Sequence, residues 1–146
     1  MTLSKSFGYA LRGILYVAMM SDEKRMIPIN EIARRLAVPR YFLGKIMNKV
    51  VKKDILNSVK GPNGGFLLSK TTLDTSLLAL LETMDGLEQF DCCVLRLRKC
   101  NAEYPCPLHK QLGSYKKDFL ELFSNTSVGS LLKEDKLEFI RSIAAR

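Results

Sequence analysis

The stretch that most constrains the fold of this chain runs from residue 30 to residue 69, where two short helical patterns precede a glycine-rich turn. Apolar residues recur at helical spacing over residues 30–37, with Asn30 as a candidate N-cap, and again from Pro39 to about residue 53. The interval Ala37-Val38-Pro39 is short enough for a tight turn, so the two patterns match a helix-turn-helix. Taken alone, the pair equally fits an ordinary helical hairpin with a basic, solvated face.

The residues that follow favour the helix-turn-helix. Residues 55–59 and 66–69 are short apolar runs that flank the turn sequence Gly61-Pro62-Asn63-Gly64-Gly65, which predicts a β-hairpin whose glycines adopt positive φ angles. A helix-turn-helix followed by a hairpin is a winged helix, whose second helix enters the major groove while the wing lies against phosphates or the minor groove. The candidate DNA-contacting residues are therefore Arg40, Tyr41, Lys45, Lys49, Lys60 and Asn63.

Helical spacing also predicts helices at residues 6–20, capped by Ser4 or Ser6, at about residues 75–86, capped by Asp74 or Thr75, and at about residues 131–145. A longer helix from residue 108 carries an apolar, aromatic-rich seam made of Leu108, Leu112, Tyr115, Phe119, Leu122 and Phe123. This seam is suited to pairing with a second copy of the chain, and burial against the helix at residues 75–86 is the alternative.

The expected fold is mostly α with a small β-hairpin wing, that is, a winged helix-turn-helix plus a long C-terminal dimerisation helix. We expect a DNA-binding domain at residues 1–86, a cysteine-rich cluster-binding loop at 87–107, and the dimerisation helix with a terminal helix at 108–146. At 146 residues and 47% apolar content, the chain is long enough for one domain with its own core.

The positive charge of the chain is confined to its first half. Residues 1–75 hold 13 Lys and Arg against 5 Asp and Glu, whereas residues 76–146 hold 10 against 10, so the first half accounts for the whole net charge of +8. This distribution favours a polyanion-binding surface joined to a part that senses or oligomerises, with a merely solubilising surface as the alternative. No secretory signal and no run of about 20 apolar residues is found, so we expect a cytoplasmic protein with no membrane contact.

All four cysteines and the only histidine of the chain lie within residues 91–109. In a reducing compartment, clustered thiols with one imidazole favour a soft metal or an iron–sulfur cluster over disulfides. A zinc site and unmetallated thiols are the alternatives, although zinc motifs usually pair cysteines two to four residues apart and only the adjacent Cys92 and Cys93 come closer. An enzyme that uses Cys106 and His109 is disfavoured, because no CxxC motif and no acidic orienting residue accompany them.

The chain resembles the Rrf-two-type family of bacterial winged-helix transcription regulators, which includes IscR-like and NsrR-like proteins. The resemblance covers essentially the whole length and is carried by Tyr9-Ala10-Leu11-Arg12, by the wing Lys60-Gly61-Pro62-Asn63-Gly64-Gly65, and by Cys93, Cys100 and Cys106 with Cys106-Pro107-Leu108-His109 opening the long helix. It implies a homodimeric, sequence-specific DNA-binding regulator and no enzyme.

The same resemblance implies a site for an iron–sulfur cluster that senses redox state, iron or nitric oxide. Cys93, Cys100 and Cys106 would be the thiolate ligands, and His109 stands where a histidine completes the 2Fe–2S site of IscR. A 4Fe–4S cluster is the alternative, and Cys92 is either buried or an alternative ligand. A regulator of the same fold that responds through thiols or a ligand, without a cluster, stays open.

Overall fold

The computed structural model describes residues 2–93, 95, 99–133, 138 and 142–143. The first helix, α1 (Lys5–Met20), begins where the side chain of Ser4 accepts a hydrogen bond from the backbone N–H of Phe7 at 3.0 Å. Its apolar residues recur at three- and four-residue spacing, and Ala10 and Ile14 are fully buried. α1 is therefore the central helix of the core, in contact with α2, α3, α4 and the hairpin.

Helices α2 (Ile29–Leu36) and α3 (Arg40–Lys52) form the predicted helix-turn-helix. The turn closes through Ala37, whose φ of +52° is left-handed, and through a hydrogen bond from the Val38 N–H to the Ala33 carbonyl at 3.0 Å. The prediction of Asn30 as the N-cap is wrong, because α2 already begins at Ile29 after Pro28. Pro28 has the extended conformation of a cap, and its carbonyl accepts from the N–H groups of the first turn.

A polar contact joins α1 to α2 beneath this motif. The hydroxyl of Tyr16, which is almost fully buried, donates to Glu31 at 2.8 Å, and Glu31 also pairs with Lys24. Burial, followed by the hydrogen bond to Glu31, raises the pKa of Tyr16. Desolvation acts to raise the pKa of Glu31, but the hydrogen bonds from Lys24 and Tyr16 together outweigh it and lower that pKa below its ordinary value.

The wing is an antiparallel hairpin of β1 (Leu56–Val59) and β2 (Gly65–Leu68), in which Leu56 pairs with Leu68 and Val59 with Gly65. In its turn only Gly61 has a positive φ, +110°. Gly64 is required for another reason, because a Cβ there would lie 1.9 Å from the carbonyl oxygen of Val59. The turn therefore needs one glycine for its conformation and one for the close approach of its two arms.

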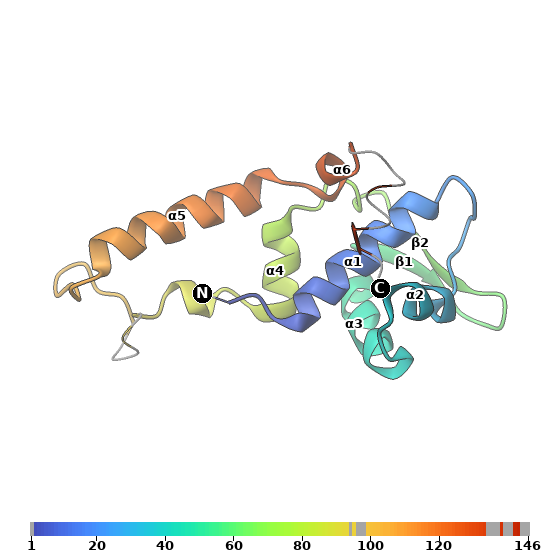
Figure 1. The fold of residues 1–146 in the computed structure, drawn as a ribbon, viewed down its shortest axis with the longest axis horizontal. Helices are drawn as coiled ribbons and strands as arrows, with labels where there is room; N and C mark the ends of the chain where they lie inside the picture. Colours follow the sequence, from blue (N-terminus) through green and yellow to red (C-terminus); the bar gives the residue numbers. More distant parts are fainter. Residues whose placement is uncertain (1, 94, 96–98, 134–137, 139–141, 144–146) are drawn as a thin grey trace.

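Helix α4 (Leu77–Asp85) follows the wing and ends at Gly86, whose φ is +72°. Its cap is Ser76, which accepts from the Ala79 N–H at 3.0 Å, so the prediction of Asp74 or Thr75 as the cap is wrong by one or two residues. A 3-10 turn, η1 (Glu88–Phe90), leads to the cysteine segment, and then come α5 (His109–Asn125) and the short α6 (Val128–Leu131). Figure 1 shows α5 projecting away from the body that α1, α2, α3 and the hairpin form.

Stacked aromatic rings attach α5 to the body of the protein. Phe123 stacks on Phe7 of α1 with ring centroids 5.8 Å apart and on Phe119 at 4.3 Å, and Phe119 stacks on Phe90 at 5.4 Å. The apolar seam of α5 is therefore divided between two surroundings. Phe119 and Phe123 pack inside, whereas the exposed residues of the seam are Leu108, Tyr115 and Leu122.

The end of the chain returns to the helix-turn-helix. Arg12 donates to the Ile143 carbonyl at 2.8 Å and to the Leu36 carbonyl at 3.1 Å, and Ile143 is buried, as expected. Most of the predicted terminal helix, including Leu137 and Ile140, lies outside the described residues. Across the described part of the chain, the helices are too short or too polar to span a bilayer.

Candidate nucleic-acid interface and metal-ligand site

The predicted DNA-contacting residues of α3 all lie on its solvent-exposed side. Tyr41, Lys45 and Lys49 are spaced by four residues and share one face of the helix, with Arg40 at its first position. Tyr41 is 77% exposed, and the Lys45 ammonium lies 4.6 Å from the centroid of its ring. The opposite side of α3 is held in the core by Leu43, Ile46, Met47 and Val50. Packing thus leaves one basic, aromatic face of α3 available to a ligand.

The wing presents Lys60 and Asn63, both exposed, beside its glycine turn. Its base is held by a hydroxyl network that the sequence interpretation missed. The fully buried Thr72 donates to the Ile55 carbonyl at 2.6 Å and accepts from the Ser69 N–H at 2.8 Å. Ser69 with Thr72 three residues later, directly after a strand, is the signal that could have identified this turn.

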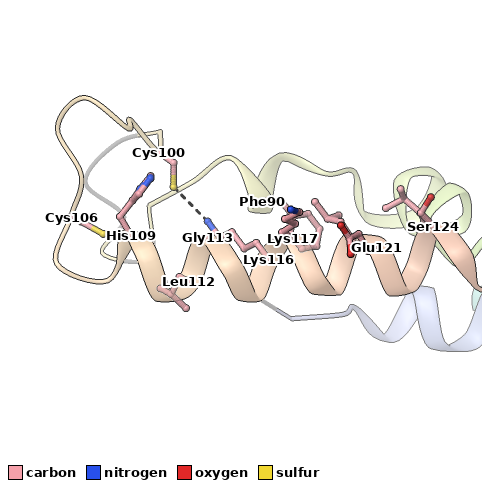
Figure 2. Close-up of a pocket in the computed structure, with 12 residues that line it drawn as sticks. Phe90, Cys100, Cys106, His109, Leu112, Gly113, Lys116, Lys117, Glu121 and Ser124 are labelled. Atoms are coloured by element: carbon pink, nitrogen blue, oxygen red, sulfur yellow. Dashed lines mark hydrogen bonds between the residues drawn. The ribbon is translucent and has the colours of Figure 1, made fainter.

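The four predicted metal ligands come together at the start of α5. Cys93, Cys100, Cys106 and His109 all line one small hollow of about 10 Å³. The His109 N–H donates to the Cys106 carbonyl at 3.0 Å, which places both residues at the first turn of the helix. Figure 2 shows the ring of His109 between Cys106 and Cys100 in this view. Side chains separated by up to sixteen residues thus border the same space.

This hollow has the donor atoms of a soft metal centre but not yet its dimensions. Three thiols and one imidazole are the ligands that iron–sulfur clusters and thiophilic metals take. The hollow has room for about one water molecule, and among the described residues no three His, Cys, Asp or Glu side chains converge closely enough to hold an ion as they stand. The residues therefore fit a cluster in chemistry and placement, and the exposed segment carrying Cys100 has to move to admit one.

The two adjacent cysteines have different surroundings. Cys93 is 6% exposed and lines the hollow, whereas Cys92 is exposed and does not line it. This difference agrees with the preference for Cys93 as a ligand, which stays a prediction. Lys99 also borders the hollow, and Arg96 and Arg98, the other cations between the ligands, lie outside the described residues.

Lys116 of α5 is a site residue that the sequence interpretation missed. Its ammonium donates to the Cys92 carbonyl at 2.8 Å and lies 3.6 Å from the Cys100 sulfur. The available signal was its spacing, since residues seven apart lie on the same side of a helix and Lys116 follows His109 by seven.

A larger open cavity of about 550 Å³ extends from this segment along α5. One end is bordered by Cys100, Cys106 and His109, and apolar walls come from Leu78, Phe90, Leu112 and Leu120. The volume lies within the range of small-molecule sites. The thiol-bearing end of α5 is therefore continuous with an apolar space between that helix and the segment that follows α4 (Figure 2).

Comparison with known proteins agrees with this architecture. The Rrf2 (Rrf-two-type) family model, described as an iron-dependent transcriptional regulator, matches residues 3–134. A protein of Aquifex aeolicus described as an HTH-type transcriptional regulator is 31% identical over 134 residues, covering 90% of this chain and 92% of the relative.

Solved structures share the fold at low sequence identity. CymR, the global cysteine regulator of B. subtilis, has a TM-score of 0.76 at 13% identity, covering 92% of this chain and 99% of that one. IscR of T. potens has a TM-score of 0.68 at 18% identity, covering 91% and 87%. The mostly helical fold with a hairpin wing is thereby confirmed. The chain belongs to the Rrf2 family and is a winged-helix, DNA-binding transcriptional regulator rather than an enzyme.

Proposed function

We propose that this chain is a cytoplasmic, homodimeric regulator that binds a specific operator and whose DNA affinity is controlled by an iron–sulfur cluster. The observation that carries the proposal is the single hollow bordered by Cys93, Cys100, Cys106 and His109 at the first turn of α5. The family description, an iron-dependent transcriptional regulator, supports it. A 2Fe–2S cluster is favoured over 4Fe–4S because an imidazole joins the three thiols.

The chain's own residues would hold such a group from two sides. Cys106 and His109 are placed by the helix, whereas Cys93 and Cys100 belong to the segment before it. A bound cluster would supply one-electron redox chemistry and reactivity towards oxidants and nitric oxide, and its imidazole ligand would raise its reduction potential. Loading and loss of the group would thus change how the segment at residues 91–108 sits on α5.

The exposed side of α5 supports a dimer. Leu108, Tyr115 and Leu122 recur every seven residues and are 43%, 57% and 61% exposed, forming one apolar stripe on the projecting helix. A second copy that covered this stripe would position two winged helices on two operator half-sites. Because the ligands lie at the start of the same helix, their state would act on the spacing between the two reading heads. In this proposal residues 1–86 bind DNA, 87–107 carry the cluster loop, and 108–146 pair the copies.

The DNA face follows from the fold of α3 and the wing. Arg40, Tyr41, Lys45 and Lys49 would meet the major groove and its phosphates, while Lys60 and Asn63 would work from the wing. Base edges are read by hydrogen-bonding and apolar side chains, so the exposed Tyr41 is a candidate for sequence readout. The lysines would supply affinity that depends on salt.

Anaerobic purification with iron, sulfide and zinc analysis tests the cluster. The parent protein should be brown, with visible charge-transfer absorption and with DNA binding that changes when the cluster is removed. Cys100→Ala should lose the chromophore, whereas Cys92→Ala should keep it. Both cysteines are exposed, so neither change disturbs the core. A colourless parent with stoichiometric zinc, or equal chromophores in the two variants, would refute the proposal.

Sedimentation analysis tests the dimer. Leu122→Glu should remove about 1–2 kcal/mol of apolar burial from each copy and raise the dimer dissociation constant by about 10² or more. Lys110→Glu is the matched control, since Lys110 is exposed and lies on the other side of α5. A parent that sediments as a monomer at all concentrations, or equal effects of the two variants, would contradict the dimer.

One observation favours a second candidate function. The cavity of about 550 Å³ touches Cys100, Cys106 and His109 and is mostly apolar, as expected for a regulator of the same fold that responds to a small ligand or through its thiols without a cluster. The same purification separates the two functions. A colourless protein that contains no iron and still binds DNA specifically would favour the ligand-responsive regulator.

A further inference from the structure

The segment that carries two of the predicted ligands is held to α5 by one side chain. Lys116 donates to the Cys92 carbonyl at 2.8 Å and lies 3.6 Å from the Cys100 sulfur, as the dashed line in Figure 2 shows for the second contact. Its partners belong to two parts of the chain that pair with each other, because Cys92 forms an antiparallel bridge with Lys99 and the Cys100 N–H donates to the Asp91 carbonyl at 2.7 Å. A single ammonium thus ties both sides of this pair to the helix.

The surroundings make this contact more than an ordinary surface lysine. Cys92, Lys99, Cys100 and residues 101–105 are exposed, so the segment has little apolar burial to hold it in place. Lys116 itself is partly buried and lies on the side of α5 that also carries His109. A charged donor that satisfies a carbonyl and a sulfur at once both positions the segment and places a positive charge beside one thiol.

We propose that Lys116 is the positioning residue of the cluster site: it fixes the backbone at Cys92 and the sulfur of Cys100 on α5, and its charge stabilises the more negative state of that site. The first part stands on the contacts alone, and the second rests on the proposed cluster. A hydrogen bond and a positive charge at a ligand sulfur favour the reduced form of an iron–sulfur centre and so raise its reduction potential.

Three variants separate this role from a general effect of charge. Lys116→Met removes the donor and keeps the length of the chain, Lys116→Arg keeps a charged donor, and Lys117→Met removes the same charge from the next, exposed position of α5. Two measurements are made on each full-length protein. One is hydrogen exchange of the Cys100 amide in the metal-free protein, and the other is the midpoint potential of the anaerobically loaded protein in a dithionite titration, in which one electron is added per step.

Lys116→Met should speed exchange of the Cys100 amide by about 2- to 10-fold, the range expected for losing one such hydrogen bond. It should also lower the midpoint potential, and Lys116→Arg should restore both values while Lys117→Met leaves both unchanged. Equal exchange in Lys116→Met and the parent would overturn the positioning role. An unchanged potential, or an equal fall in Lys117→Met, would overturn the electrostatic role. If the parent takes up no cluster, the proposed function and the electrostatic role fail together, and the exchange measurement still decides the positioning role.

Discussion

Removing single lysines from α3 should lower the salt dependence of DNA binding by a countable amount. Four exposed cations of each chain are predicted to face phosphates, namely Arg40, Lys45, Lys49 and Lys60. Each phosphate neutralised contributes about −0.9 to the slope of log affinity against log salt, so one chain should give about −3.6 and a dimer about −7. Between about 50 and 200 mM salt, a dimer should then lose about 10⁴-fold in affinity.

Lys45→Met and Lys49→Met each remove one phosphate contact from both copies and should reduce the slope by about 2. Methionine is a good helix former, so α3 should keep its structure, which circular dichroism checks. The assay is fluorescence anisotropy of a labelled mixed-sequence duplex across a KCl series. Lys110→Met, an exposed lysine at the start of α5, is the control and should leave the slope unchanged. An almost flat slope for the parent, or an equal reduction in Lys110→Met, would refute the assignment of α3 to DNA.

Two further predictions concern stability. Gly64→Ala should lower the free energy of unfolding by roughly 1–3 kcal/mol in urea titrations, because the new Cβ would meet the Val59 carbonyl oxygen, whereas Gly113→Ala, with no atom within 4 Å of its Cβ, should raise it by about 0.5–1 kcal/mol; the opposite order would contradict the geometry of the wing. The folded-state pKa of Glu31 is lowered, so its carboxylate stabilises the protein above the unfolded-state pKa and this contribution is lost as the pH falls through the folded-state pKa. Glu31→Gln should therefore destabilise by about 1 kcal/mol at pH 7, a difference that shrinks below about pH 4, and a difference that does not change with pH would contradict the ion pair.

The elements that could be predicted from sequence are those encoded by local patterns. Helical spacing identified α2 and α3, and the turn glycines identified the hairpin, because side-chain periodicity and φ preferences act over a few residues. Boundaries were less accurate, as at α2, where Asn30 resembles a cap and yet Pro28 has the conformation that begins the helix. Capping competes between neighbouring residues, and the outcome depends on how the preceding segment packs. Here Ile27 pairs with Phe66 of the wing, which fixes where Pro28 lies.

The candidate site shows the same division. Clustering and donor chemistry singled out Cys93, Cys100, Cys106 and His109, and the structure places all four around one hollow, while their role as ligands stays a prediction. Lys116 could not be found in this way, because its partners are a backbone carbonyl and a sulfur far from it in sequence. Only the position of α5 beside the cysteine segment reveals the contact.

By itself, the sequence determined the winged helix-turn-helix and the grouping of thiols with one imidazole, since both depend on residue type and short-range spacing. Tertiary structure alone decided how the apolar seam of α5 is used. Phe119 and Phe123 stack on the rings of Phe90 and Phe7 and are taken into the body, which leaves Leu108, Tyr115 and Leu122 facing outward. The physical reason is that a helix with a wide apolar arc can bury only the part that meets a neighbour, and which part that is depends on the whole fold rather than on the helix.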